Sequence, residues 1–326
     1  MDWRSSEPCT IEFHIPANPT PSFFSQIGLF ALSLRELGPP YSTAPIHVSL
    51  GHTKRVPIPQ EYGLAQCAHQ LRWHWVIDDF VENTHFVQAE NRFRVIGDSE
   101  FICLCDADTL LVRRIDDLLM ELRAEPAVAG VVVHGPQFPH TKKKSARQSW
   151  EEAAQALLGR SISFPCRYTL SKTLGTADNE TPFCPNFGFV IGSRELMRSL
   201  GDGVSDLRKR IFDLFPTLAD GKPPVMHFFG AQIALALALE KNRTPWRALP
   251  MRFNWPNDTA ADTLYPEEIP EIRLVHYLRR TQYQRERVFC EWKSFESFLR
   301  ADLPGAGDRV LQQRVRQLTG GRFLGP

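Results

Sequence analysis

The sequence has almost no net charge, no long apolar run and no apolar leader. It contains 38 Lys and Arg residues against 37 Asp and Glu residues, a formal charge of +1, whereas nucleic-acid-binding proteins usually carry a strong basic excess. No stretch approaches the roughly 18 apolar residues that cross a bilayer, and the opening MDWRSSEPCT is polar. We therefore expect a soluble, cytoplasmic protein that binds no nucleic acid. The basic residues within 142–147 are typical of a solvated loop. Peripheral contact of these residues with an anionic membrane or polysaccharide is the alternative.

The cysteines do not form the pattern of a zinc site or a disulfide framework. There are seven, an odd number, scattered along the chain without a C-x-x-C pair. Cys103 and Cys105 are the closest, but they sit inside an apolar run at the spacing of a strand. We expect them to pack as small hydrophobic side chains.

What the sequence does contain is an alternation of strand and helix patterns typical of an α/β fold. With 326 residues, of which 43% are hydrophobic, the chain can bury a sizeable core. Strands separated by helices predict a mostly parallel sheet flanked by helices. Strands are expected at 11–18, 45–51, 72–76, 101–105, 127–135, 186–192 and 272–278, and helices at 23–37, 86–96, 115–124, within 140–159, from 195, and at 228–242. Two further helices, at 289–303 and 308–318, predict a small C-terminal helical appendage (287–326) on a main domain (1–286).

The chemistry is expected where the strand at 101–105 ends. The apolar run FICLC stops at Asp106 and Asp108, and a second apolar run, Thr109–Leu111, follows. In open α/β sheets, ligands bind beyond the carboxyl ends of the strands. Two neighbouring carboxylates there suit a hard divalent cation such as Mn²⁺ or Mg²⁺, with phosphate oxygens completing its coordination. The alternative is an aspartate that caps a loop beside a solvated neighbour.

The segment FICLCDADTLLVRRIDDLL resembles the metal-binding segment of glycosyltransferases with the GT-A fold, most closely the glycogenin and bacterial lipopolysaccharide galactosyltransferase type. The resemblance covers roughly residues 10–280, since IEFHIPAN, NRFRVI, PNFGFVIG, FFGAQIALALAL and RLVHYL follow in the expected order. It implies a GT-A (Rossmann-like) fold, Mn²⁺ or Mg²⁺, and a nucleotide-diphosphate sugar donor, namely a UDP-sugar. It also implies a retaining hexosyl transfer to a glycan, a lipid-linked sugar or a protein.

The resemblance also implies roles for individual residues. It makes Asp106, Asp108 and His276 the metal ligands and gives Asn186 and Gln232 catalytic contacts with the donor sugar. The residues expected to contact the donor are Ile15, Ala17, Asn18, Arg92, Asp106, Ala107, Asp108 and Arg279.

Most of these residues also have a simpler explanation. His276 fits an ordinary core or surface histidine, and Arg92 fits an exposed helix charge. Asn18 fits a turn residue, and Gln232 fits a helix cap or a buried polar group. Arg279, with Arg280 beside it, fits a solvated arginine pair.

The sequence departs from the pattern of these transferases in three places. Ala231 stands where an acid commonly precedes the glutamine. HYLRRTQYQRERVF replaces the usual glycine and Lys-Pro-Trp after the metal-binding histidine, and no acid follows the first strand in HIPANPTPSF. These departures leave the contacts with the diphosphate and the identity of the nucleotide open.

Two other functions remain as alternatives. A phosphatase of the haloacid dehalogenase type also ends a strand in Asp-x-Asp, but it generally has threonine where this chain has Leu110. A non-catalytic protein that binds a nucleotide sugar or a glycan on the same scaffold is the second alternative, because fold does not determine function.

Overall fold

The structure is a computed structural model of the chain, and it describes residues 8–78, 89–94, 96–138, 145–171, 179–214, 226–278 and 283–326. For residues 226–228 it describes the backbone only. The helix expected at 86–96 is helical at 89–94. Arg279, Arg280 and the lysines at 142–144 lie outside the described residues.

Strands and helices alternate along the chain, as the apolar patterns predict. The strands are β1 (Ile11–Ala17), β2 (Ile46–His52), β3 (Leu71–Ile77), β4 (Phe101–Leu104), β5 (Thr109–Leu111), β6 (Val128–Val132), β7 (Cys166–Arg167), β8 (Glu180–Thr181), β9 (Pro185–Ser193), β10 (Trp246–Ala248), β11 (Trp255–Pro256) and β12 (Leu274–His276). The α-helices are α1 (Pro21–Glu36), α3 (Asp116–Ala124), α4 (Ala146–Leu158), α5 (Arg194–Leu214), α6 (Met226–Asn242), α7 (Thr259–Leu264), α8 (Trp292–Arg300) and α9 (Ala306–Thr319).

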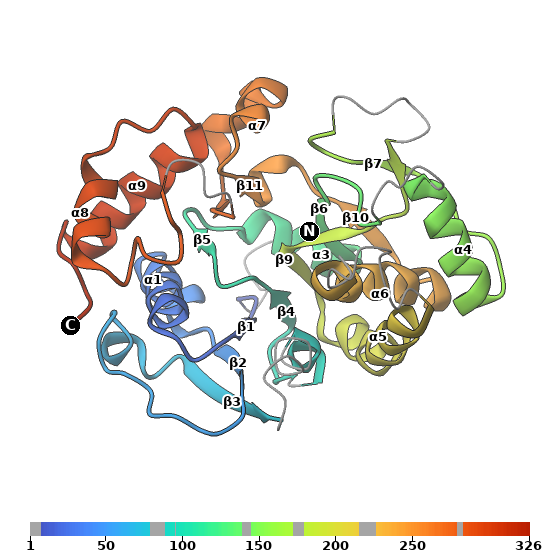
Figure 1. Ribbon diagram of the computed structural model, residues 1–326, viewed down its shortest axis with the longest axis horizontal. Coiled ribbons are helices and arrows are strands. Elements are labelled where there is room, and N and C mark those ends of the chain that lie inside the picture. Colours follow the sequence, from blue (N-terminus) through green and yellow to red (C-terminus); the bar gives the residue numbers. More distant parts are fainter. Residues whose placement is uncertain are drawn as a thin grey trace.

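A seven-stranded sheet forms the centre of the molecule, with the strand order β10-β6-β9-β4-β1-β2-β3 (Figure 1). β1 pairs in parallel with β2 and β4, β2 with β3, and β10 with β6. β9 is the exception, since it runs antiparallel to both β4 and β6. The predicted α/β fold with a mostly parallel sheet is therefore confirmed.

Helices cover both faces of this sheet, which explains why its inner strands are so apolar. On one face, α1 and the C-terminal helices share a core with β1 and β2. On the other face, α4, α5 and α6 pack against β4, β6 and β9 (Figure 1). The predicted helices α8 and α9 thus pack against the sheet domain and belong to the same core as α1, while the proposed boundary at 286/287 stays a prediction.

A second, three-stranded sheet brings the late part of the chain to the end of β4. Its order is β11-β12-β5, and β12 runs antiparallel to β5 with His276 opposite Thr109. Because β5 begins just after Asp106 and Asp108, this pairing carries His276 to the carboxyl end of β4. The strand β5 had not been predicted.

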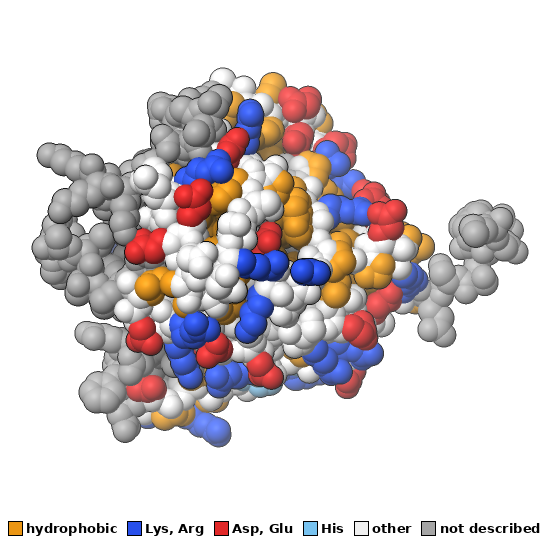
Figure 2. Space-filling model, turned by 90° about the vertical axis from the view of Figure 1, so that its right-hand side faces the viewer, with side chains coloured by type: hydrophobic (Ala, Val, Ile, Leu, Met, Phe, Trp, Pro, Cys, Tyr) orange, Lys and Arg blue, Asp and Glu red, His pale blue; other side chains and the backbone are white. Residues whose placement is uncertain are grey.

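The described surface agrees with the nearly balanced charge of the sequence. On the side of the molecule toward α4, basic and acidic side chains are interspersed (Figure 2). No helix in the described ranges combines the length and the apolar character needed to cross a membrane.

Candidate functional site

Asp106 and Asp108 lie in the tight turn that joins β4 to β5. The Thr109 hydroxyl donates to the Asp106 carbonyl over 2.8 Å, and the Tyr277 N–H donates to the Asp108 carbonyl over 3.0 Å. The buried Tyr277 hydroxyl, whose pKa is raised well above its ordinary value by burial, donates to the Ala107 carbonyl over 3.4 Å. The backbone of all three turn residues is therefore held by neighbouring polar groups, so both carboxylates project from a fixed turn.

His276 completes a group of three possible metal ligands. Its Nε2 atom lies 3.3 Å from Asp108 Oδ1 and 3.9 Å from Asp106 Oδ2. One ligand atom from each of the three residues lies within 4.8 Å of the others. The exposed fraction of the side chain is 31% for Asp106, 14% for Asp108 and 6% for His276, so the group opens to solvent on the Asp106 side.

The other ring nitrogen of His276 faces the backbone of β9. Nδ1 is buried without a hydrogen-bond partner in the described chain, and both amide atoms of the fully buried Asn254 have none either. A Cβ placed on Gly188 would lie 2.3 Å from His276 Nδ1 and 2.4 Å from Asn254 Oδ1. Glycine at position 188 thus leaves the space in which the imidazole and the Asn254 amide stand.

Two arginines neutralise part of the negative charge. Arg285 forms an ion pair with Asp108 Oδ2, and Arg92 lies 3.4 Å from Asp106 Oδ1 with its guanidinium over the Phe187 ring. Burial alone would raise the pKa of Asp108, but His276 and Arg285 outweigh it and lower that pKa. The Asp108 carboxylate is therefore ionised near neutral pH.

These residues fit a divalent cation of the manganese or magnesium type. Two carboxylates and one imidazole supply oxygen and nitrogen ligands to one point, and solvent access on one side leaves room for further oxygen ligands. Nε2 of His276 is the nitrogen that faces both carboxylates, at 3.3 and 3.9 Å, so it is the atom of this ring that would bind such an ion.

The residues expected near the nucleotide have different environments. The side chains of Ile15 and Ala17 are fully buried in the core, so only their backbone is available to a ligand. Asn18 follows β1 directly, at the same end of the sheet as Asp106. Arg92 is buried and contacts Asp106. The alternative that Arg92 is only an exposed charge on a helix is therefore wrong.

The two amides expected near the sugar are connected to the site to different degrees. Asn186 Oδ1 accepts from the Gly188 N–H over 2.9 Å, beside the His276 ring. The backbone carbonyl of Gln232 accepts from the thiol of Cys184, the residue just before β9. Its Oε1 atom is buried without a hydrogen-bond partner in the described residues, and no described contact joins Gln232 to the two aspartates. Ala231, where an acid is usual, is 7% exposed.

Arg285 is the site residue that sequence reasoning missed. The prediction named Arg279 as the cation beyond the third ligand, and Arg279 lies outside the described residues. The structure shows Arg285, nine residues after His276, on Asp108 instead. The arginine-rich run after β12 was the available signal, but it did not distinguish one arginine from another.

Comparison with solved structures agrees with the fold. An active-site mutant of the galactosyltransferase LgtC has a TM-score of 0.51 and 11% identity, covering 94% of this chain and 95% of that chain. A complex of LgtC with donor and acceptor sugar analogues has a TM-score of 0.50 and 12% identity, covering 94% and 96%. No protein-family model matches the chain, and no curated protein matches it in sequence.

The mixed sheet, its flanking helices and these similarities define the GT-A fold. The expected resemblance to GT-A glycosyltransferases is thereby confirmed for the fold, over nearly the full length of the chain.

Proposed function

We propose that this chain transfers a sugar from a nucleotide-diphosphate donor, namely a UDP-sugar, to a glycan, a lipid-linked sugar or a protein. The observation that supports this most is the meeting of Asp106, Asp108 and His276 at the carboxyl end of the central strand β4. In open α/β sheets this end is where ligands bind.

The three residues would hold Mn²⁺ or Mg²⁺, which neutralises charge on the departing nucleotide diphosphate when bound. Asp106 and Asp108 contribute negative charge, and their turn is fixed by the hydrogen bonds of Thr109 and Tyr277. His276 contributes a nitrogen ligand, Nε2, which faces both carboxylates. Such fixed groups stabilise developing charge without reorganisation during the reaction.

Arg285 has a second role in this proposal, as a contact for the diphosphate. Its guanidinium is bound to Asp108 and its side chain is 27% exposed. A planar guanidinium binds phosphate oxygens through paired hydrogen bonds, and the chain lacks the lysine that similar transferases carry nearby. Arg92 is 4% exposed and is held by Asp106 and Phe187, so we assign it to orienting Asp106.

We assign the retaining outcome, the hexosyl group and the roles of Asn186 and Gln232 from the resemblance. Asn186 is the better supported of the two, because its amide is bonded to the backbone beside His276. For the acceptor we propose only its class, namely a glycan, a lipid-linked sugar or a protein.

A panel of nucleotide sugars tests the proposal. The full chain is incubated with each sugar and Mn²⁺, and release of the free nucleotide diphosphate is measured with and without a chelator. We expect metal-dependent release from at least one UDP-sugar, and its loss in Asp108→Asn, which keeps the size of the side chain and removes its charge. Arg287→Gln is the control, since Arg287 is 57% exposed and pairs with Glu291.

The alternatives give different results in the same experiment. Binding of UDP-sugars without turnover would indicate the non-catalytic binding protein. Release of inorganic phosphate from phosphate monoesters, with no effect on UDP-sugars, would indicate the phosphatase and contradict our proposal.

A further inference from the structure

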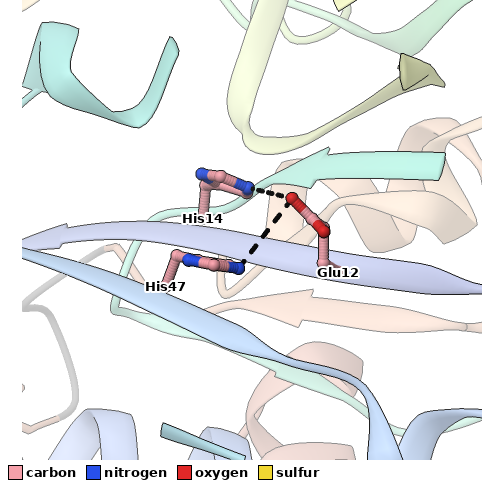
Figure 3. A group of neighbouring side chains, drawn as sticks. All are labelled: Glu12, His14 and His47. Carbon is pink, nitrogen blue, oxygen red and sulfur yellow. Dashed lines mark hydrogen bonds and ion pairs between the residues drawn. The ribbon is translucent and has the colours of Figure 1, made fainter. Parts of the chain in front are cut away.

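A second group of possible ligands lies inside the central sheet, away from the turn at 106–108. Glu12 and His14 project from β1 and His47 from the neighbouring β2, and both imidazoles turn toward the Glu12 carboxylate (Figure 3). The exposed fraction of the side chain is 1% for Glu12, 1% for His14 and 13% for His47. We refer to these three residues as the Glu12–His14–His47 cluster.

The strands themselves produce this convergence. Residues two apart on a strand point to the same face, which puts Glu12 and His14 together, and the parallel register sets His47 directly beside His14. The apolar residues of β1, Ile11, Phe13 and Ile15, point to the core shared with α1. A carboxylate and two imidazoles on the other side of a central strand are costly to bury unless they are paired or bind an ion.

The three ligand atoms lie close enough together, all within 4.8 Å, to share one ion. Glu12 Oε1 lies 2.8 Å from His14 Nε2 and 3.9 Å from His47 Nε2. Two ligand atoms at about 2.1 Å from a tetrahedral zinc ion stand roughly 3.4 Å apart, and the two observed separations lie on either side of that value.

The surrounding contacts hold the ligand atoms in place. The Gly97 and Ser99 N–H groups donate to the two Glu12 oxygens over 2.7 and 3.2 Å. His47 Nδ1 is bonded to His74 Nε2 over 3.0 Å, which leaves His47 Nε2 for an ion, as outer hydrogen bonds do at metal sites. His14 Nδ1 is buried without a hydrogen-bond partner in the described chain, so the polar contact of this ring is the one between Nε2 and Glu12. An ion would take the place of the proton in that contact, with Nδ1 then carrying the ring proton.

The charge states of the ligands agree with this geometry. Burial would raise the pKa of Glu12, but the hydrogen bonds from His14, Gly97 and Ser99 outweigh it and bring that pKa to about 2. Burial, together with the neighbouring His14 ring, lowers the pKa of His47 to about 4. An ionised carboxylate and a neutral imidazole are the forms that bind metal.

A groove of about 410 Å³, whose lining includes Glu12, His47, Arg72 and Asp98, leads from solvent to the cluster. Arg72 is paired with His47 in the register of β2 and β3, and its guanidinium donates to the carbonyls of His69 and Leu71 over 2.9 and 3.1 Å. Asp98 supplies an opposite charge in the same groove. An ion could therefore reach the cluster from solvent through this groove, together with a water molecule as its fourth ligand.

The geometry points to a binding site for a divalent transition-metal ion of the zinc type on Glu12, His14 and His47. Two imidazoles and one carboxylate are a donor set that zinc and related ions prefer over magnesium or calcium. The site joins β1 to β2 and to the 97–99 segment, and it is separate from the proposed donor site.

Cobalt(II) titration of the metal-stripped full chain tests this site, since Co²⁺ replaces zinc and absorbs visible light when tetrahedral. Asp108→Ala serves as the background, because it disables the proposed donor site. We expect that chain to bind about one equivalent of Co²⁺ with intense visible bands, and the further change His47→Gln to abolish the bands. His69→Gln, at an exposed histidine, should leave them unchanged.

A second measurement needs no change in the cluster. Zn²⁺ should raise the midpoint of thermal unfolding of the Asp108→Ala chain, because an ion that binds only the folded state stabilises it. Absence of this shift, or equal Co²⁺ bands before and after His47→Gln, would overturn the site. Neither readout depends on sugar transfer, so failure here leaves the proposed function untouched, and failure of that function leaves this site untouched.

Discussion

Replacing Gly188 by alanine perturbs the candidate site through a single added methyl group. The new Cβ would lie 2.3 Å from Nδ1 and 2.8 Å from Cε1 of His276, and 2.4 Å from Asn254 Oδ1. Carbon atoms in contact with other heavy atoms rest at about 3.5 Å, so the ring or the amide must move by about 1 Å. On its other side the His276 ring faces Asp106 and Asp108, and Asn254 is fully buried.

Two effects should follow, of different size. Overpacking of a buried position costs about 1–3 kcal/mol of stability, which leaves a protein of ordinary stability folded. Displacing a ligand or catalytic group by 1 Å reduces activity by up to about 100-fold. We therefore expect Gly188→Ala to fold, to need at least about tenfold more Mn²⁺ for half-maximal turnover, and to lose most of its maximal rate.

The assay is Mn²⁺-dependent release of nucleotide diphosphate from a UDP-sugar, measured well below the unfolding temperature. Gly203→Ala in α5 is the matched control, since a Cβ there meets nothing within 4 Å, and the change should stabilise the helix by about 0.5–1 kcal/mol without altering activity. Wild-type manganese dependence in a folded Gly188→Ala chain would show that the position of His276 does not matter, which would refute the three-residue site.

Three further predictions concern single side chains. His276→Ala should raise the Mn²⁺ concentration for half-maximal activity, because one of the three proposed ligands is lost; an unchanged metal requirement would make His276 structural. Arg285→Gln should weaken UDP binding measured by calorimetry by about tenfold, the loss of one charge-assisted hydrogen bond, whereas Arg287→Gln should not; equal affinities would exclude Arg285 from the donor site. The folded chain holds the pKa of His47 at about 4, so between pH 6.5 and 4 the unfolded chain binds a proton that the folded chain does not. The free energy of unfolding should therefore fall by roughly 2 kcal/mol between pH 7 and 5 in the presence of a chelator. Urea unfolding of His47→Gln should show a smaller fall over the same range, because the contribution of His47 is absent. An equal fall in the variant and the unchanged chain would contradict the lowered pKa of His47.

Local patterns predicted most of the elements that build the fold. β1, α1, β4 and β6 all have apolar periodicity and clear flanking turn residues, and each lies within a few residues of its predicted range. β5 was missed because three residues are too short to show a period. The antiparallel direction of β9 could not be predicted, since it depends on how the chain returns to β4 and not on the apolar sequence of the strand itself.

The candidate site could be predicted in part, because its residues differ in how local their signal is. Asp106 and Asp108 are neighbours after an apolar strand, so their convergence follows from strand geometry. His276 was named from the resemblance, and the pairing of β12 with β5 explains why it reaches them. Arg285 binds a carboxylate 177 residues earlier in the chain, and no local pattern encodes such a contact.

The Glu12–His14–His47 cluster shows the same limit. The alternation of Glu12 and His14 between apolar residues was visible in the sequence, but it was explained as part of the first strand. His47 joins them only through the register between β1 and β2. A charged residue and a histidine on one face of an otherwise apolar central strand were the signal that could have indicated a ligand.

The central claim is that Asp106, Asp108 and His276 together bind the metal that serves the donor. The most direct test is anomalous diffraction at the manganese edge from crystals of the full chain grown with Mn²⁺ and UDP. We expect a peak at the end of β4, with His276 Nε2 at about 2.0–2.3 Å from it and an oxygen of Asp106 and of Asp108 among its ligands. A manganese peak that lacks contact with these three residues, or UDP bound at another face of the sheet, would contradict the account.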